Sequence, residues 1–189
     1  ESLSRAELVT EMSKDSVKQK ILSESTGYTG RFNHDVAHGF HKMYPLSEQP
    51  NYEPTPEDSV EALAKQADCD PYEYAYDVLM SNSGKGLMFF PLTDFSEHTL
   101  NPTYERLNHH GAFWSLSDGG AHCRLICDAS TPTYMLSHWT RDRSNGPKMK
   151  IEEAVKLMTH DTAEIYGLLG DRGTLEVGKR ADLNVLDYD

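Results

Sequence analysis

The stretch from Ser115 to Asp128 holds the residues whose types and spacing are best suited to chemistry. It reads SLSDGGAHCRLICD, and it follows an apolar segment that begins at Gly111. The carboxylate of Asp118 is followed at once by two glycines. Acids at the C-terminal ends of buried parallel strands are where α/β folds gather catalytic groups, and glycines let the backbone turn sharply or approach a ligand there. An aspartate before glycine is also typical of an ordinary turn, so both interpretations stay open on this stretch alone.

The neighbours of Asp118 also allow more than one interpretation. His122 either orients Asp118 or contacts a substrate, or it hydrogen-bonds the backbone at the start of a helix. Cys123 and Cys127 would share one face of a helix, but two thiols lack the further ligands of a closed zinc site. Their pattern therefore favours small buried side chains.

Arginines and histidines elsewhere provide the remaining candidates. Arg141 and Arg143 offer guanidinium groups that bind carboxylates with two-point geometry, and ion pairs within the fold are the alternative for at least one of them. His34, His38 and His41 are three or four residues apart, a spacing that would place them on one face of a helix and allow a metal set. Gly39 and the following extended residues argue against a helix there, which favours surface or packing histidines.

Two apolar runs predict buried strands that would position Asp118. They cover residues 86–92 and 111–117. A connection of about twenty residues with a helix predicted over residues 101–108 is typical of a right-handed βαβ crossover between parallel strands. Both strand ends would then point the same way, with Asp118 at one of them.

Helices are predicted wherever apolar residues recur at three- and four-residue steps behind a capping residue. Ser4 with Glu7 predicts a capping box for a helix over residues 3–25, with an interruption near Ser13. Thr55 before Pro56 and Asp70 before Pro71 mark two further helix starts. Other helices are expected over residues 132–143, 151–158 and 161–169, and two short strands over residues 173–188.

Composition restricts the classes of partner. The chain has 189 residues and a net charge of −12, which argues against nucleic acid and anionic membranes as partners. No apolar run approaches the about 18 residues of a membrane span. Three cysteines without a CxxC pair favour a reducing compartment. We therefore expect a soluble, cytoplasmic protein. The first residue is Glu1 rather than Met, so we also expect a piece of a longer polypeptide, whose unpaired strands invite homo-oligomers.

Three stretches together resemble the C-terminal part of the N-acyl-D-amino-acid deacylases, the D-aminoacylase-like members of the amidohydrolase superfamily. They read SDGGAHCRLICDASTPTY, HWTRDR and HDTAEIYGLLGDRGTLEVGKRADLNVLDYD, within a similarity that extends over residues 45–189. The resemblance implies an α/β fold: the C-terminal part of an amidohydrolase-type (β/α)8 (TIM) barrel over residues 1–172, with an inserted helical region, and strands of a flanking β-sandwich over residues 173–189. Taken alone, the chain would look α+β and helix-rich.

The resemblance also implies zinc-assisted hydrolysis of an N-acyl-D-amino acid. Asp118 matches the aspartate that follows the last barrel strand, where it binds the metal and takes the proton of the attacking water. A divalent ion lowers the pKa of bound water toward about 7, and a carboxylate can pass the proton to the leaving amine. His122, Arg141 and Arg143 are then expected to bind the substrate. The family's paired HxH histidines do not occur in this sequence. Most zinc ligands are therefore expected outside the chain, and the chain alone is expected to be inactive.

Two alternatives remain at this level. The first is a non-catalytic binding or assembly module that uses the helices and sandwich strands without chemistry. The second is another amidohydrolase, such as a dihydropyrimidinase-like or dipeptidase-like enzyme, which would keep the role of Asp118 and change the substrate.

Overall fold

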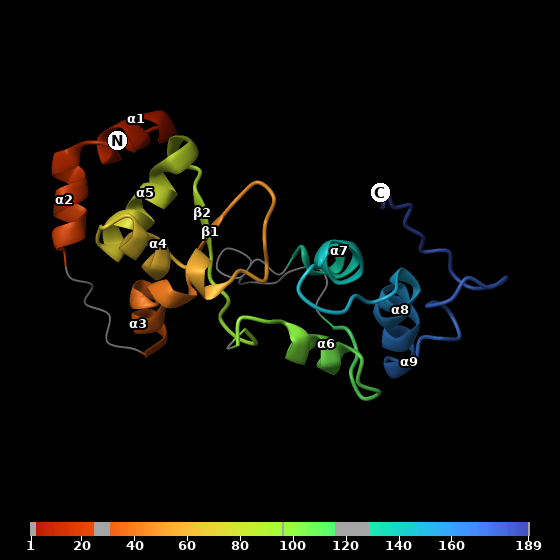
Figure 1. Ribbon diagram of the computed structural model, residues 1–189. Helices are drawn as coiled ribbons and strands as arrows, with labels where there is room; N and C mark the ends of the chain where they lie inside the picture. Colours follow the sequence, from red (N-terminus) through yellow and green to blue (C-terminus); the bar gives the residue numbers. More distant parts are fainter. Residues whose placement is uncertain (1–2, 25–30, 96, 116–128, 189) are drawn as a thin grey trace. The chain divides into compact units, whose positions relative to one another are not determined.

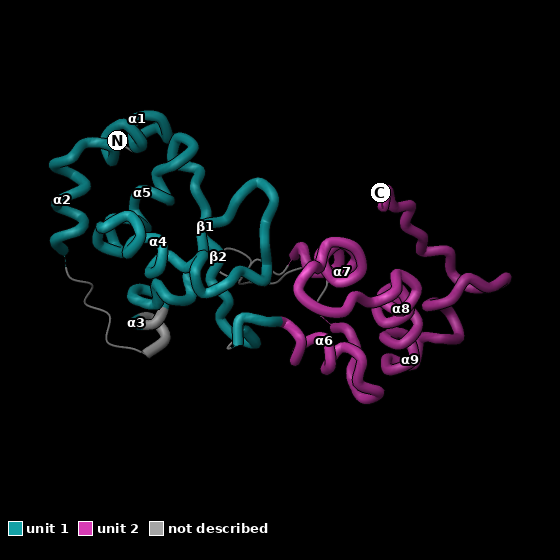
Figure 2. The backbone as a smooth tube through the Cα atoms, in the orientation of Figure 1, with its two compact units in different colours: residues 1–99 teal, residues 100–189 magenta. Residues whose placement is uncertain are grey.

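The computed structural model describes residues 3–24, 31–95, 97–115 and 129–188. The chain divides into two compact units, residues 1–99 and residues 100–189 (Figure 2). The first unit contains α1 (Arg5–Met12), α2 (Asp15–Ser23), α3 (Arg31–His38), β1 (Tyr44–Leu46), α4 (Val60–Gln66), α5 (Pro71–Gly84) and β2 (Leu87–Phe89), with 3-10 turns at Phe40–Lys42 and Pro56–Asp58 (Figure 1). The second contains α6 (Asn101–Leu107), α7 (Thr131–Ser137), α8 (Ile151–Lys156) and α9 (Thr162–Ile165), with π-helical turns at His138–Asp142 and Leu157–Asp161.

The first helices begin and end where local capping predicts. The Glu7 carboxylate accepts a hydrogen bond from the Ser4 N–H at 2.8 Å, and the Glu7 N–H donates to Ser4 Oγ at 3.4 Å. Helix α1 ends at Met12 with Ser13 as its C-cap, and Lys14 has an extended backbone before α2. The predicted capping box and the predicted interruption are both confirmed.

Helix α2 is attached to α5 by an ion-paired lysine. Lys18 Nζ lies 2.9 Å from the Glu73 carboxylate and 2.8 Å from the Asp77 carboxylate. These hydrogen bonds hold the pKa of Lys18 above its ordinary value. Because both α1 and α2 also contact α5, the N-terminal helices belong to the first unit.

The structure has a helix, α3, around His34 and His38, where Gly39 and the residues after it had argued against one. Both residues lie in α3, and their ring centroids are 4.4 Å apart. Gly39 follows the helix and begins a 3-10 turn in which Phe40 is buried. The glycine thus ends the helix rather than preventing it, and burial of Phe40 against the ring of Tyr72 favours the arrangement.

The sheet of the first unit is antiparallel. Tyr44 pairs with Phe89 and Leu46 with Leu87. The expectation of a buried parallel strand over residues 86–92 is therefore wrong in pairing and in burial, since Leu87 is 60% exposed. Residues 111–115 form no strand, and Phe113 is 47% exposed. The described part of the chain shows a helix-rich fold with a small sheet and no barrel. Closing a barrel requires more strands than the apolar runs of this chain can form.

Each unit has its own apolar core. In the first, Phe40, Met43, Val60 and Ala75 are buried together. Helix α4 enters this core one turn later than predicted: Thr55 caps the preceding 3-10 turn, and Ser59 caps α4 itself. Asp70 and Pro71 begin α5 as predicted. The core of the second unit consists of Met135, Trp139, Met149, Ala154 and Leu157.

The C-terminal segment leaves its apolar residues in solvent. Residues 173–188 form no strand in the structure. Val177 and Val185 are fully exposed, and Leu175 is 83% exposed. The two predicted sandwich strands are therefore not formed here, and the expected domain boundary between residues 172 and 173 stays a prediction. No helix within the described ranges combines the length and the apolar character needed to cross a bilayer.

Candidate functional site

Asp118 and His122 lie outside the described residues, as do Cys123 and Cys127. What the structure describes is the chain that leads toward them. The carbonyl oxygen of Trp114, four residues before Asp118, accepts a hydrogen bond from Thr162 Oγ1 at 3.0 Å. The start of α9 therefore holds the chain just before the candidate catalytic stretch.

Arg143 is almost completely buried, with 1% of its surface exposed. Its Nη1 donates to the carbonyl oxygen of Pro147 at 2.8 Å. Its Nη2 donates to Asn101 Oδ1 at 2.7 Å and to the carbonyl oxygen of Asn145 at 3.0 Å. A buried charge is very unfavourable without such partners. In this structure Arg143 joins α6 to the segment that precedes α8, and its predicted contact with substrate is not tested.

Aromatic rings and a glycine complete the surroundings of this guanidinium. Its central carbon lies 5.0 Å from the ring centroid of Trp139 and 5.6 Å from that of Tyr104. Gly146 has φ of +131°, and a Cβ there would lie 2.7 Å from Arg143 Nη2 and 2.5 Å from Asn101 Oδ1. Only glycine fits this backbone beside the buried charge.

Arg141 is exposed, in contrast to Arg143. Its Nε and Nη2 donate to the two oxygens of Asp142 at 2.7 and 3.1 Å, and its Nη1 donates to the carbonyl oxygen of Tyr188 at 2.7 Å. The hydrogen bond from Arg141 holds the pKa of Asp142 below its ordinary value, against the smaller opposing effect of burial. Since 42% of its side chain is exposed, a ligand carboxylate can reach Arg141. Substrate binding by this arginine stays a prediction.

A group of metal-ligating side chains lies at the start of α9. One ligand atom from each of His160, Asp161 and Glu164 falls within 4.8 Å of the others. His160 Nδ1 is 2.8 Å from Asp161 Oδ1, and Lys156 pairs with the same carboxylate. Burial raises the pKa of Asp161, but the hydrogen bonds from Lys156 and His160 outweigh it, and the pKa lies below its ordinary value.

This cluster was not predicted from the sequence, in which Asp161 and Glu164 were expected in a helix and had no assigned role. The available signal was the spacing of four residues between His160 and Glu164, which puts two side chains on one helix face. Within the described ranges this is the only group of three such ligands. The pair His34 and His38 shares a helix face without a third ligand from that part of the chain.

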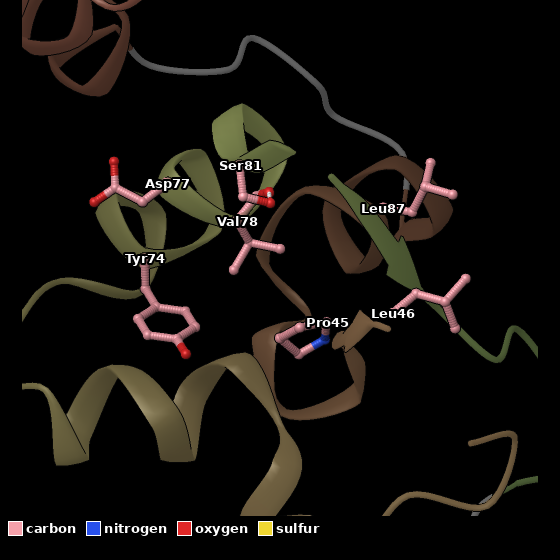
Figure 3. A pocket seen from close by; sticks show the side chains of 7 residues that line it. All are labelled: Pro45, Leu46, Tyr74, Asp77, Val78, Ser81 and Leu87. Atoms are coloured by element: carbon pink, nitrogen blue, oxygen red, sulfur yellow. Dashed lines mark hydrogen bonds between the residues drawn. The ribbon is translucent and has the colours of Figure 1, made fainter. Parts of the chain in front are cut away.

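A shallow hollow of about 320 Å³ lies on the first unit (Figure 3). Its one charged group is Asp77, whose carboxylate is bound by Lys18. The hollow therefore presents mainly apolar atoms and lacks a set of catalytic side chains among its lining residues. Those residues are Pro45 and Leu46 of β1, Tyr74, Asp77, Val78 and Ser81 of α5, and Leu87 of β2.

Comparison with known proteins shows to which family the chain is related. The model of a family described as "Amidohydrolase family" matches residues 40–189. The chain belongs to the amidohydrolase family. The matched range includes Asp118, both arginines and the cluster at His160. The match therefore confirms the amidohydrolase membership that the sequence resemblance implied. It does not confirm the resemblance to D-aminoacylases in particular.

The curated relatives that this chain matches are longer proteins. Uncharacterized proteins of Mycobacterium bovis and Mycobacterium tuberculosis are 29% identical over 127 residues, which cover 67% of this chain and 20% of each relative. An imidazolonepropionase of Agrobacterium fabrum is 33% identical over 78 residues, 40% of this chain and 19% of that enzyme. The chain thus spans about a fifth of the length of the curated relatives it matches. No solved structure matches it.

Proposed function

We propose that this chain is the C-terminal portion of a zinc-dependent amidohydrolase that removes the acyl group from N-acyl-D-amino acids. Membership of the amidohydrolase family supports hydrolysis of a carbon–nitrogen bond. The observation that carries the finer proposal is the stretch SDGGAHCRLICDAS inside the matched range, in which Asp118 follows an apolar segment and precedes two glycines. We include in this proposal that the substrate is an N-acyl-D-amino acid, that the metal is zinc and that the protein works in the cytoplasm.

Asp118 has two tasks in this reaction. Zinc, when bound, lowers the pKa of water toward about 7. Asp118 would accept a proton from the attacking water as the water oxygen adds to the amide carbonyl, and it would then donate this proton to the amine nitrogen as the carbon–nitrogen bond breaks. The products are a carboxylic acid and a free D-amino acid, so atoms and protons balance.

The substrate's own carboxylate needs a cationic partner. Of the two candidate arginines, Arg141 is exposed and Arg143 is buried among oxygens of its own unit. A guanidinium binds a carboxylate through two parallel hydrogen bonds, as Arg141 does with Asp142 here. Arg141 therefore fits substrate binding better than Arg143, and His122 is proposed as a further contact.

The chain alone cannot hold the catalytic metal. A catalytic zinc usually has three protein ligands, and Asp118 supplies one. We therefore expect no hydrolysis of N-acetyl-D-amino acids by this chain by itself, and activity only in a polypeptide that adds the upstream histidines.

The test is an assay of the complete polypeptide with zinc on N-acetyl-D- and N-acetyl-L-amino acids. We expect preference for the D-forms. Asp118→Asn should lower kcat by at least about 100-fold, because it removes the group that moves the proton. Asp187→Asn, an exposed acid in the C-terminal segment, is the matched control and should leave kcat unchanged. Full activity of Asp118→Asn would contradict the proposal.

The likeness to an imidazolonepropionase favours a second candidate, hydrolysis of another carbon–nitrogen bond with the same role for Asp118. Turnover of imidazolone propionate by the complete polypeptide, without turnover of N-acyl-D-amino acids, would favour it. The non-catalytic module is the remaining alternative. It predicts a complete polypeptide that hydrolyses neither substrate when zinc is supplied.

A further inference from the structure

The cluster at the start of α9 carries an inference that is independent of Asp118. We propose that His160, Asp161 and Glu164 form a binding site for one divalent transition-metal ion, for which Zn²⁺ is a suitable probe. The site uses one imidazole and two carboxylates, all from the second unit. It is assigned from the placement of these side chains and needs no residue outside the described ranges.

The backbone explains why the three ligands meet. The π-helical turn Leu157–Asp161 leads directly into α9. His160 and Glu164 are four residues apart, and Asp161 and Glu164 are three apart, so each pair shares a helix face. π-helical turns inside helices occur frequently at functional sites.

The separations are close to those of a zinc site. The ligand atoms lie within 4.8 Å of one another. Bonds of about 2.0–2.2 Å to a tetrahedral zinc ion place ligand atoms about 3.3–3.6 Å apart. Glu164 is exposed, so rotation of its side chain can close this difference without moving the backbone. Imidazole nitrogen and carboxylate oxygen are both ordinary zinc ligands.

A cation is already held at this position. The Lys156 ammonium pairs with Asp161 while 59% of its side chain is exposed. Exposed ion pairs of this kind are weak, so a divalent ion can displace the lysine. Two carboxylates face one ammonium at this position, and the net charge of −12 on the chain also attracts cations.

The backbone behind the ligands is fixed by long-range contacts. Thr162 Oγ1 donates to the carbonyl oxygens of Leu157 and Trp114, both at 3.0 Å. Ala163, between the ligands, is buried. Ligands on a backbone held in this way bind a metal more tightly than ligands on a mobile loop, because less has to be ordered on binding.

Calorimetric titration of the chain with Zn²⁺ alone tests the site. We expect one ion per chain. His160→Asn and Glu164→Gln should each weaken binding by at least about tenfold, since even changes behind the ligands cost about 10–100-fold. Glu152→Gln on α8 removes the same charge from another exposed position and should change affinity by less than about twofold. Lys156→Met should tighten binding, a gain that misfolding cannot produce.

Further variants separate this site from other zinc ligands and from the proposed catalytic centre. Asp118→Asn and the pair His34→Asn with His38→Asn should retain binding, and Zn²⁺ should shift the imidazole NMR signals of His160. The proposal is overturned if the chain binds no Zn²⁺, if Glu152→Gln weakens binding as much as Glu164→Gln, or if binding is lost in Asp118→Asn or the His34 and His38 variant. The titration measures binding and not hydrolysis. A chain without this Zn²⁺ site would therefore not contradict the proposed deacylase activity, and a polypeptide without deacylase activity would not contradict the site.

Discussion

Two arginines two residues apart have opposite environments. The Arg143 guanidinium is enclosed by carbonyl oxygens and aromatic rings, whereas Arg141 lies at the surface against Asp142 and Tyr188. From the sequence pattern RDR alone, both arginines are equivalent candidates for binding a substrate carboxylate. Their environments predict different consequences for stability, and these can be measured on the chain itself.

Arg143→Ala should lower the free energy of unfolding by about 2–4 kcal/mol, because it leaves buried oxygens without donors and opens a gap beside Trp139. Arg141→Ala is the matched control and should cost less than about 1 kcal/mol, since exposed ion pairs contribute little. Urea unfolding followed by tryptophan fluorescence measures both. Equal losses for the two variants would contradict the assignment of Arg143 as a buried structural residue.

At the scale of elements, helix starts depend on single side chains. Ser59 is buried, with 3% of its surface exposed. Its hydroxyl accepts a hydrogen bond from the Ala62 N–H at 3.2 Å and donates to the carbonyl oxygen of Pro56 at 2.7 Å. It therefore connects the 3-10 turn to α4. The next residue, Val60, is fully buried in the core of the first unit.

Ser59→Ala should lower the free energy of unfolding of the first unit by about 1–2 kcal/mol, the usual effect of losing a helix N-cap. Ser23→Ala, at the exposed end of α2, removes a hydroxyl that donates to the carbonyl oxygen of Lys20 at 2.8 Å. It should change stability by less than about 0.5 kcal/mol. Thermal unfolding of both variants gives the comparison, and a larger loss in Ser23→Ala would show that Ser59 does not begin α4.

At the scale of the whole molecule, the C-terminal segment over residues 173–188 leaves apolar side chains exposed. Leu175, Val177, Leu183 and Val185 alternate with polar residues and are all more than half exposed. Alternating apolar residues with unpaired backbone are prone to pair with another chain. The homo-oligomers expected from the sequence stay a prediction, and we propose that these residues make the contact.

Val177→Lys combined with Val185→Lys should reduce self-association of the chain without lowering its melting temperature, because both side chains lie in solvent. Asn184→Lys adds a positive charge between two apolar residues of the same segment and should reduce association less. Sedimentation velocity at several concentrations measures the difference. Unchanged association in the double variant would place the contact elsewhere.

The sequence by itself determined the features that depend on neighbours within about four residues, together with the family. The capping box of Ser4 and Glu7 and the start of α5 at Asp70 follow from hydrogen bonds between close residues, whose geometry the chain order already specifies. Family membership follows from side chains in a fixed order over residues 40–189. Neither inference requires knowledge of which segments meet.

Only the tertiary structure decided the features that depend on distant contacts. The helix through His34 and His38 forms together with the burial of Phe40, although the local sequence pattern disfavours a helix there. Strands β1 and β2 pair in antiparallel fashion, although the spacing of the apolar runs indicated a parallel crossover. Arg143 is buried because Asn101 and Trp139 meet around it. His160, Asp161 and Glu164 converge because a π-helical turn, held through Thr162 to Trp114, sets their directions, and no periodicity in the sequence reports such a contact.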